Sequence, residues 1–167
     1  MPNFPALLLV LIWCAAITWF DWNRRRIPNS LVSAGLCVAV LSLVFQGQTP
    51  LGAGPWLSLV GAGAGLLVML PMYALRVMAA GDVKLFAAVG ALFGVWALLP
   101  VWLIASLLAG LHAALWLSAR HLLPQYAASP RLGAFRQLPY GIHLAAGIAC
   151  VALCPGIVSA LTPQAFL

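Results

Sequence analysis

The sequence contains only two acidic side chains, Asp21 and Asp82, and no glutamate. Asp21 directly follows an apolar run over residues 4–20, and Asp82 directly precedes a second run that begins at residue 83. Two carboxyl groups in contact cannot both ionise easily, so such a pair holds one proton. The ionised member can take a proton from water while the protonated member donates to a carbonyl oxygen. The pair therefore fits hydrolysis of a peptide bond by direct attack of water, without a metal or a covalent intermediate.

Each aspartate also has other interpretations. Asp82 can cap a helix, since Gly81 permits a turn before it, and Asp21 can pair with a nearby arginine in a hydrated loop. Paired carboxylates in a membrane can also relay protons or bind cations. Transport sites usually lie near the bilayer midplane between internal repeats, and no repeat is visible in this chain. An aspartic endopeptidase is the main prediction, and a proton- or cation-coupled transporter is the alternative.

The composition predicts that the bilayer surrounds this chain. Of its 167 residues, 65% are hydrophobic and 6% are charged, whereas soluble domains carry roughly 25% charged residues. The longest apolar run would form a helix of about 54 Å, longer than the hydrocarbon core of about 30 Å. We therefore expect this run to turn between Gly94 and Pro100. The apolar runs cover residues 4–20, 30–45, 55–75, 83–118 and 138–161. They predict an all-α, polytopic membrane protein with six transmembrane helices in a single domain, residues 1–167.

The positive charges indicate how this domain is oriented. All eight basic residues fall in the first, third and fifth connections or at their borders, and the second and fourth connections carry none. Because basic loops face the cytoplasm, both termini should lie outside it and both aspartates at its membrane face. The net charge of +6 is thus explained by topology, and no nucleic acid partner is expected. A cleaved signal peptide needs basic residues before its apolar core, and residues 1–5 have none.

Three segments together resemble the bacterial type IV prepilin peptidases, membrane aspartic peptidases of the GxGD class. The three are Asp21 with Ile27-Pro28-Asn29, then Ala80-Gly81-Asp82-Val83-Lys84-Leu85, and Leu138-Pro139-Tyr140-Gly141. The resemblance implies an enzyme of the bacterial inner membrane that cleaves the leader from pilin-like precursors at the cytoplasmic face. It also implies that Asp21 and Asp82 are the catalytic pair and that no cofactor takes part. An inactive pilus-assembly subunit is a further alternative. The oligomeric state is not indicated.

The neighbours of the aspartates have expected supporting roles. Pro28 and Asn29 can start the second helix, proline as a fixed turn and asparagine as a cap. Gly81 lets backbone or substrate approach Asp82 closely. Lys84 either lowers the pKa of the pair or extends its ammonium to the lipid headgroups.

The late segment contributes three more expected site residues: Pro139, Tyr140 and Gly141. The Tyr140 hydroxyl either hydrogen-bonds near the site or anchors the chain at the membrane interface. The histidines His112, His121 and His143 have no metal-ligand spacing, so packing or interfacial roles are expected for them.

Two features depart from the long members of the resembled family. Ala79 replaces the first glycine of GxGD, which would be costly only where the backbone needs a positive φ. Long members also carry a domain with paired CxxC zinc ligands after the first span and methylate the new amino terminus. Here that connection is only residues 21–29, and no CxxC pair occurs. The sequence therefore resembles the short form of tight-adherence pili, with peptidase activity, no zinc-binding domain, no metal and no methyl transfer.

Overall fold

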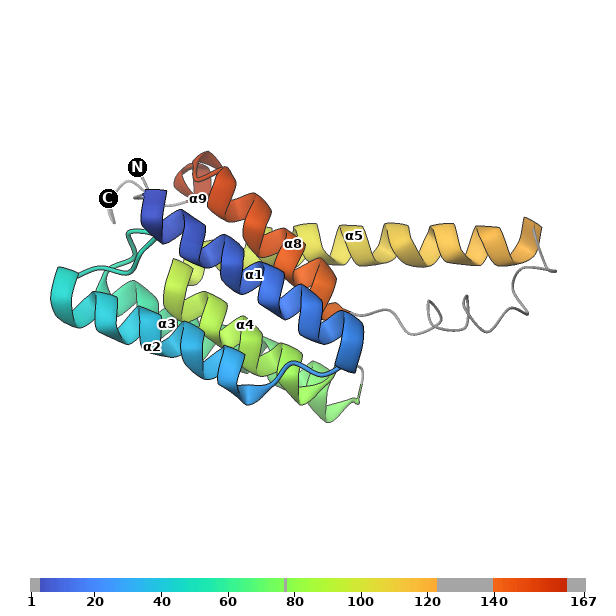
Figure 1. The fold of residues 1–167 in the computed structure, drawn as a ribbon, viewed down its shortest axis with the longest axis horizontal. Helices are drawn as coiled ribbons and strands as arrows, with labels where there is room; N and C mark the ends of the chain where they lie inside the picture. The colour runs from blue at the N-terminus through green and yellow to red at the C-terminus, as the bar shows by residue number, and fades with distance from the viewer. Residues whose placement is uncertain (1–3, 77, 123–139, 162–167) are drawn as a thin grey trace.

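The computed structural model describes residues 4–76, 78–122 and 140–161, which form helices and short connections (Figure 1). No strand occurs in this part of the chain, so the predicted all-α class is confirmed. The described helices are α1 (Phe4–Arg24), α2 (Asn29–Gln46), α3 (Pro55–Ala74), α4 (Ala80–Phe93), α5 (Val95–Leu122), α8 (Tyr140–Leu153) and α9 (Gly156–Leu161).

Four of the described helices, α1, α2, α3 and α5, are long and apolar enough to cross a membrane. With the apolar composition, they identify an integral membrane protein. Helices α4 and α8 have 14 residues each, fewer than the roughly 20 that a spanning helix usually needs. The six-span arrangement therefore stays a prediction.

The long apolar run breaks at Gly94, between α4 and α5. Gly94 has a φ of 81°, a conformation that glycine adopts without a steric penalty. Pro100, the other expected limit of the turn, lies inside α5 instead, where it removes one helical hydrogen bond. The last apolar run is also interrupted, because α8 ends at Leu153 and Pro155 separates it from the short α9. Proline cannot supply the backbone N–H that a continuing helix requires.

The packing between helices is densest within two groups (Figure 1). Helices α1, α5 and α8 form one group, with α8 between the other two, and α2, α3 and α4 form the second, with α4 between its neighbours. Contacts of α5 with α3 and α4 join the groups. Most residues of α4 are buried, and Leu85, Ala88 and Val89 have no exposed surface. We call the boundary between the two groups the seam.

Glycines bring α3 and α4 into direct backbone contact. Gly61 on α3 faces Gly90 on α4, and a Cβ atom on either would overlap the carbonyl group of the other. One turn along α3, a Cβ on Gly65 would lie 2.7 Å from the carbonyl oxygen of Phe86. Small residues are the usual means by which helices approach closely in a membrane. The α3–α4 pair is therefore held together along its length by backbone packing.

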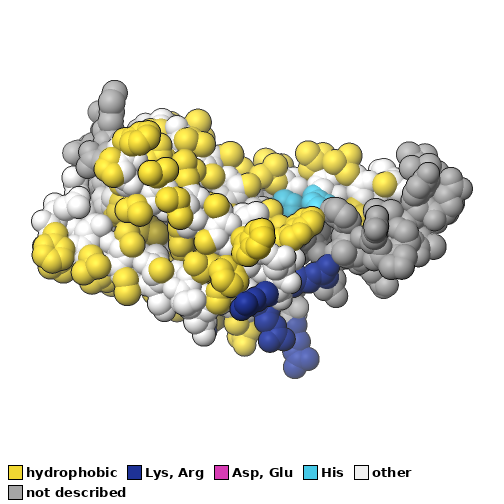
Figure 2. Space-filling model, viewed as in Figure 1, with side chains coloured by type: hydrophobic (Ala, Val, Ile, Leu, Met, Phe, Trp, Pro, Cys, Tyr) yellow, Lys and Arg dark blue, Asp and Glu magenta, His cyan; other side chains and the backbone are white. Residues whose placement is uncertain are grey.

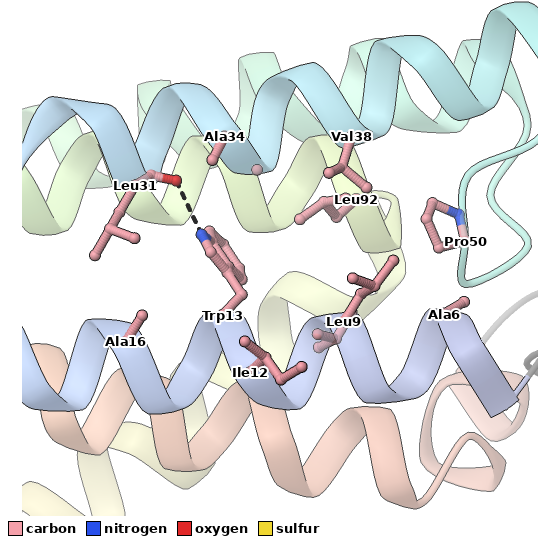
Figure 3. A pocket seen from close by; sticks show the side chains of 12 residues that line it. Ala6, Leu9, Ile12, Trp13, Ala16, Leu31, Ala34, Val38, Pro50 and Leu92 are labelled. Atoms are coloured by element: carbon pink, nitrogen blue, oxygen red, sulfur yellow. Dashed lines mark hydrogen bonds between the residues drawn. The ribbon is translucent and has the colours of Figure 1, made fainter.

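Helices α1 and α2 face each other across the seam and enclose an apolar cavity of about 250 Å³ (Figure 3). The indole ring of Trp13 on α1 crosses the cavity. Its N–H donates a hydrogen bond to the carbonyl oxygen of Leu31 on α2, at 2.9 Å. The Trp13 ring packs on Gly35 of α2, where an added Cβ would lie 2.7 Å from it. Helices α1 and α2 thus meet here through a side chain, whereas α3 and α4 meet backbone to backbone.

The α3–α4 contact predicts a cost for one added methyl group. Gly90→Ala should destabilise the protein by about 1–3 kcal/mol, because the new Cβ must push the backbone of Gly61 away. Gly63→Ala is the matched control, since nothing lies within 4 Å of a Cβ added there. Unfolding midpoints measured in detergent should fall for Gly90→Ala alone. Equal midpoints for the two variants would contradict the close contact.

Candidate active site

Asp21 and Asp82 lie at the same end of the helix bundle, in the last turn of α1 and the first turn of α4. Their exposed fractions are 6% and 9%, and no acidic side chain is visible on the face that Figure 2 shows, where basic side chains gather at one end. The charge of Asp21 acts on Asp82, so the carboxyl groups are close enough to influence each other. Asp21 was expected to follow the first helix, but α1 continues through it to Arg24.

Direct packing of α1 on α4 does not bring the two aspartates to the same end of the bundle. Helix α1 packs chiefly on α8, and α4 chiefly on α3 and α2. The start of α8 contacts Asp21 and lies near Asp82. Asp21 accepts hydrogen bonds from the backbone of α8. Tyr140, the first residue of α8, interacts electrostatically with Asp82.

Hydrogen bonds from α8 fix the Asp21 carboxylate. Its Oδ2 accepts from the backbone N–H of Ile142 at 3.0 Å, and the carboxylate also accepts from the N–H of Gly141. These donors belong to the first turn of α8, whose N–H groups have no partner within the helix. A helix N-terminus also favours a negative charge. The arrangement offsets part of the cost of burying the carboxylate.

Gly141 has a geometric reason to be glycine. A Cβ at this position would lie 2.7 Å from Oδ2 of Asp21 and 2.9 Å from its Cγ, closer than real Cβ atoms come to other heavy atoms. The side chain of Asp21 would have to move to admit it. Pro139, which precedes this segment, lies outside the described residues.

Asp82 is the third residue of α4, and Ala79 occupies the N-cap position. The Asp82 carboxylate accepts a hydrogen bond from the backbone N–H of Ala79, which is one half of a capping box. Asp82 therefore stabilises the helix start from the third position rather than from the cap itself. Ala79 has φ −76° and ψ 149°, an extended conformation open to any residue. Its replacement of the first GxGD glycine thus introduces no backbone strain.

Ile27 fills the space between the starts of α4 and α8 and is 8% exposed. A Cβ on Gly81 would lie 3.3 Å from the Cβ of Ile27, and one on Gly141 would lie 3.1 Å from its Cδ1. The missing side chain of Gly81 thus makes room for Ile27. It does not leave an open path to Asp82. Ile27 was part of the matched motif but had no role assigned to it. The sequence feature that could have indicated a buried role for Ile27 is its position, as an apolar residue directly after three arginines.

The start of α2 differs from its prediction. Pro28 is at the N-cap position with φ −67° and ψ 142°, and no side chain caps this helix start. The expectation that Asn29 caps α2 is therefore wrong, because Asn29 is already the first helical residue. Its Oδ1 instead accepts a hydrogen bond from Nζ of Lys84 at 3.3 Å. Lys84 is exposed, on a different face of α4 from the buried Asp82.

Four polar side chains on α5 and α8 complete the surroundings of the aspartates. The Tyr140 hydroxyl hydrogen-bonds with Ser106 of α5. His143 is 7% exposed and close enough to Asp21 for their charges to interact. Its ring also meets that of His112 edge to face, with centroids 5.2 Å apart. No feature of the sequence points to Ser106, and packing or interfacial roles are the ones expected there for both histidines. Within the described ranges, no group of three His, Cys, Asp or Glu side chains could hold a metal ion.

Comparison with known proteins supports the resemblance seen in the motifs. A profile of the type IV leader peptidase family matches residues 8–114. A prepilin leader peptidase/N-methyltransferase of Aeromonas salmonicida (strain A449) is 36% identical over 110 residues, and one of Aeromonas hydrophila is 34% identical over 110 residues. Each match covers 61% of this chain but only 36% of the relative. No solved structure matches significantly. With more than half of its length matched by the profile, the chain belongs to the type IV leader peptidase family.

Proposed function

We propose that this protein is an aspartic endopeptidase that removes the leader from pilin-like precursors, with Asp21 and Asp82 as its catalytic pair. One observation carries the proposal above all. In a chain of this family, the only two acidic residues are buried at the same end of the bundle and interact electrostatically. Burial of two interacting carboxyl groups is costly, and ionisable groups kept in a membrane protein despite that cost mark a functional site.

The proposed topology has six spans, with both termini outside the cytoplasm and the aspartates at the cytoplasmic face of a bacterial inner membrane. Two observations support it. The connections at the aspartate end carry Arg24, Arg25, Arg26 and Arg76, whereas residues 47–54 at the other end carry no charge. Helix α4, although short, is almost wholly surrounded by the other helices, so neighbouring helices rather than lipid cover it.

The two carboxyl groups have different surroundings, which suggests a division of labour. Asp21 accepts two backbone hydrogen bonds at a helix N-terminus, and Arg25 and His143 act on it electrostatically. Asp82 accepts one, from Ala79, and has the negative charge of Asp21 beside it. The shared proton is therefore better placed on Asp82.

In the proposed reaction, Asp21 takes a proton from water as the oxygen attacks the scissile carbonyl carbon. Asp82 donates its proton to the carbonyl oxygen, giving a neutral tetrahedral intermediate. As the C–N bond breaks, the proton on Asp21 passes to the leaving nitrogen. Asp82 regains a proton from the collapsing hydroxyl, which restores the starting pair.

The proposed substrate has a short leader followed by an apolar helix. A cut at the membrane edge would place its scissile bond beside Asp21 and Asp82 while the apolar helix stays in the bilayer. We further propose that the chain is a single peptidase domain that needs no cofactor and transfers no methyl group. Between α1 and α2 the chain has only residues 25–28, which leaves no room there for a zinc-binding domain.

The pair predicts that each carboxyl group is indispensable. Asp21→Asn and Asp82→Asn keep the side-chain shape but cannot share a titrating proton, so each should lower precursor cleavage by roughly 100-fold or more. Co-expression with a pilin precursor, followed by the gel shift that leader loss causes, measures this. Asn23→Ala is a control, because the exposed Asn23 side chain donates a hydrogen bond to the backbone of Trp19 within α1. Normal cleavage by either aspartate variant would reject the proposed function.

The close approach of Gly141 to Asp21 predicts a second effect on activity. Gly141→Ala should lower the cleavage rate by roughly 10- to 100-fold, because the added Cβ displaces the Asp21 carboxylate. Gly110→Ala on α5 is the matched control, since a Cβ there meets nothing within 4 Å. Both variants should reach the membrane in equal amounts. A Gly141→Ala enzyme as active as the control would show that the carboxylate does not need this position.

The short α1–α2 connection predicts cleavage without methylation. The purified protein, supplied with a precursor and S-adenosylmethionine, should release a mature product with an unmodified amino terminus. Mass spectrometry of the product measures this directly, with a methylated synthetic peptide as the standard. A product heavier by one methyl group would contradict the prediction.

A further inference from the structure

An open groove of about 490 Å³ lies between α5 and α8. Its α5 wall runs from Leu108 to Trp116, where the lining positions recur every three or four residues and so share one face of the helix. This wall is about 12 Å long, or about two helical turns. The α8 wall is formed by Ile142, His143 and Ala146. Histidine side chains are visible among hydrophobic ones on the face that Figure 2 shows.

The groove begins directly beside the candidate active site. Ile142 lines it, and the backbone N–H of the same residue donates to Oδ2 of Asp21 at 3.0 Å. A chain bound in the groove therefore passes within one residue of the hydrogen bond that fixes Asp21.

The apolar cavity between α1 and α2 does not reach the site in this way. Its α1 wall ends at Ala16, which lies about 7.5 Å along the helix from Asp21. The Trp13 ring also crosses that cavity and is tied to α2 by its hydrogen bond. The α5–α8 groove is therefore the better placed of the two to hold a chain whose scissile bond meets the aspartates.

The lining of the groove suits an uncharged, apolar chain. Among the described residues that line it, none is acidic and none is lysine or arginine, so a basic segment bound there would lose its hydration without gaining a counter-charge. The α5 wall lies within Val95–Ala119, a stretch long and apolar enough to cross a membrane. An apolar helix can therefore enter the groove sideways from the bilayer. Such helices bind by placing side chains three and four residues apart into a groove.

We propose that the α5–α8 groove binds the apolar helix of the precursor next to the scissile bond and thereby positions that bond at Asp21 and Asp82. The inference rests on the proposed function and assigns the place where its substrate is recognised. The precursor helix fits the groove better than a lipid acyl chain does, because it is covalently joined to the bond that must reach Asp21. The basic leader is excluded from the groove by its charge.

Photo-cross-linking tests which molecule occupies the groove. p-Benzoylphenylalanine is placed at position 111 or at position 110, in the Asp82→Asn protein so that the precursor stays intact. Leu111 lines the groove, whereas Gly110 is outside the lining and a Cβ added there meets no described atom within 4 Å. The two positions differ by about 100° around the helix but little in depth.

Light should join the precursor to position 111 with a yield roughly 10-fold above that of position 110, because only the former faces the groove. Mass spectrometry should locate the cross-link in the apolar helix of the precursor. Equal yields, cross-links to the leader, or cross-links from position 111 to lipid alone would overturn the inference.

Kinetics test the same groove from its α8 wall. Ala146→Leu narrows the groove, so KM for the full-length precursor should rise by roughly 10-fold with little change in kcat, the pattern of lost substrate binding. Ala114→Leu is the matched control, since Ala114 is exposed on α5 and lies outside the lining. An unchanged KM for Ala146→Leu, or the same rise for both variants, would contradict the proposed groove.

The outcomes separate this inference from the function on which it rests. A wild-type protein that leaves the precursor uncut would refute the proposed function. Normal cleavage by the wild type, without the cross-link at position 111, would refute the binding groove alone.

Discussion

The hydrogen bonds from the first turn of α8 to the Asp21 carboxylate are the interaction on which the site depends. The bond from Ile142 joins residues that are 121 positions apart in the sequence. The first N–H groups of a helix have no acceptors within the helix, and a buried carboxylate needs hydrogen-bond donors. The contact between α8 and Asp21 therefore satisfies both groups at once. The contact also explains why position 141 is occupied by glycine, since the Asp21 carboxylate leaves no room there for a side chain. It places Tyr140 near Asp82 and His143 near Asp21 as consequences of one helix start.

Around this contact, the two aspartates have unequal roles in holding the fold. Asp21 ties α1 to α8, whereas Asp82 stabilises the start of its own helix through Ala79. Ile27 then fills the gap between the two helix starts. The same carboxyl groups that are proposed to activate water thus also satisfy backbone donors. Their replacement by asparagine preserves much of this bonding, which is why that substitution separates chemistry from folding.

Much of this arrangement could be predicted from the sequence, because its strongest signals are local. Apolar runs gave the first three helices within a few residues, and Gly94 fell within the predicted turn. Local patterns say little about which helices pack together. The position of α8, which binds Asp21 and lies near Asp82, depends on tertiary contact. The electrostatic interaction of His143 with Asp21 likewise depends on tertiary contact, since an isolated histidine in an apolar run carries no sign of a distant aspartate.

The seam between the two helix groups has a mechanical consequence. Asp21 belongs to the group of α1, α5 and α8, and Asp82 to the group of α2, α3 and α4. The second group is stiffened by backbone contact between α3 and α4, while α1 and α2 meet across an apolar cavity. The distance between the two carboxyl groups therefore depends on how the two groups of helices fit against each other, because each aspartate is carried by a different group.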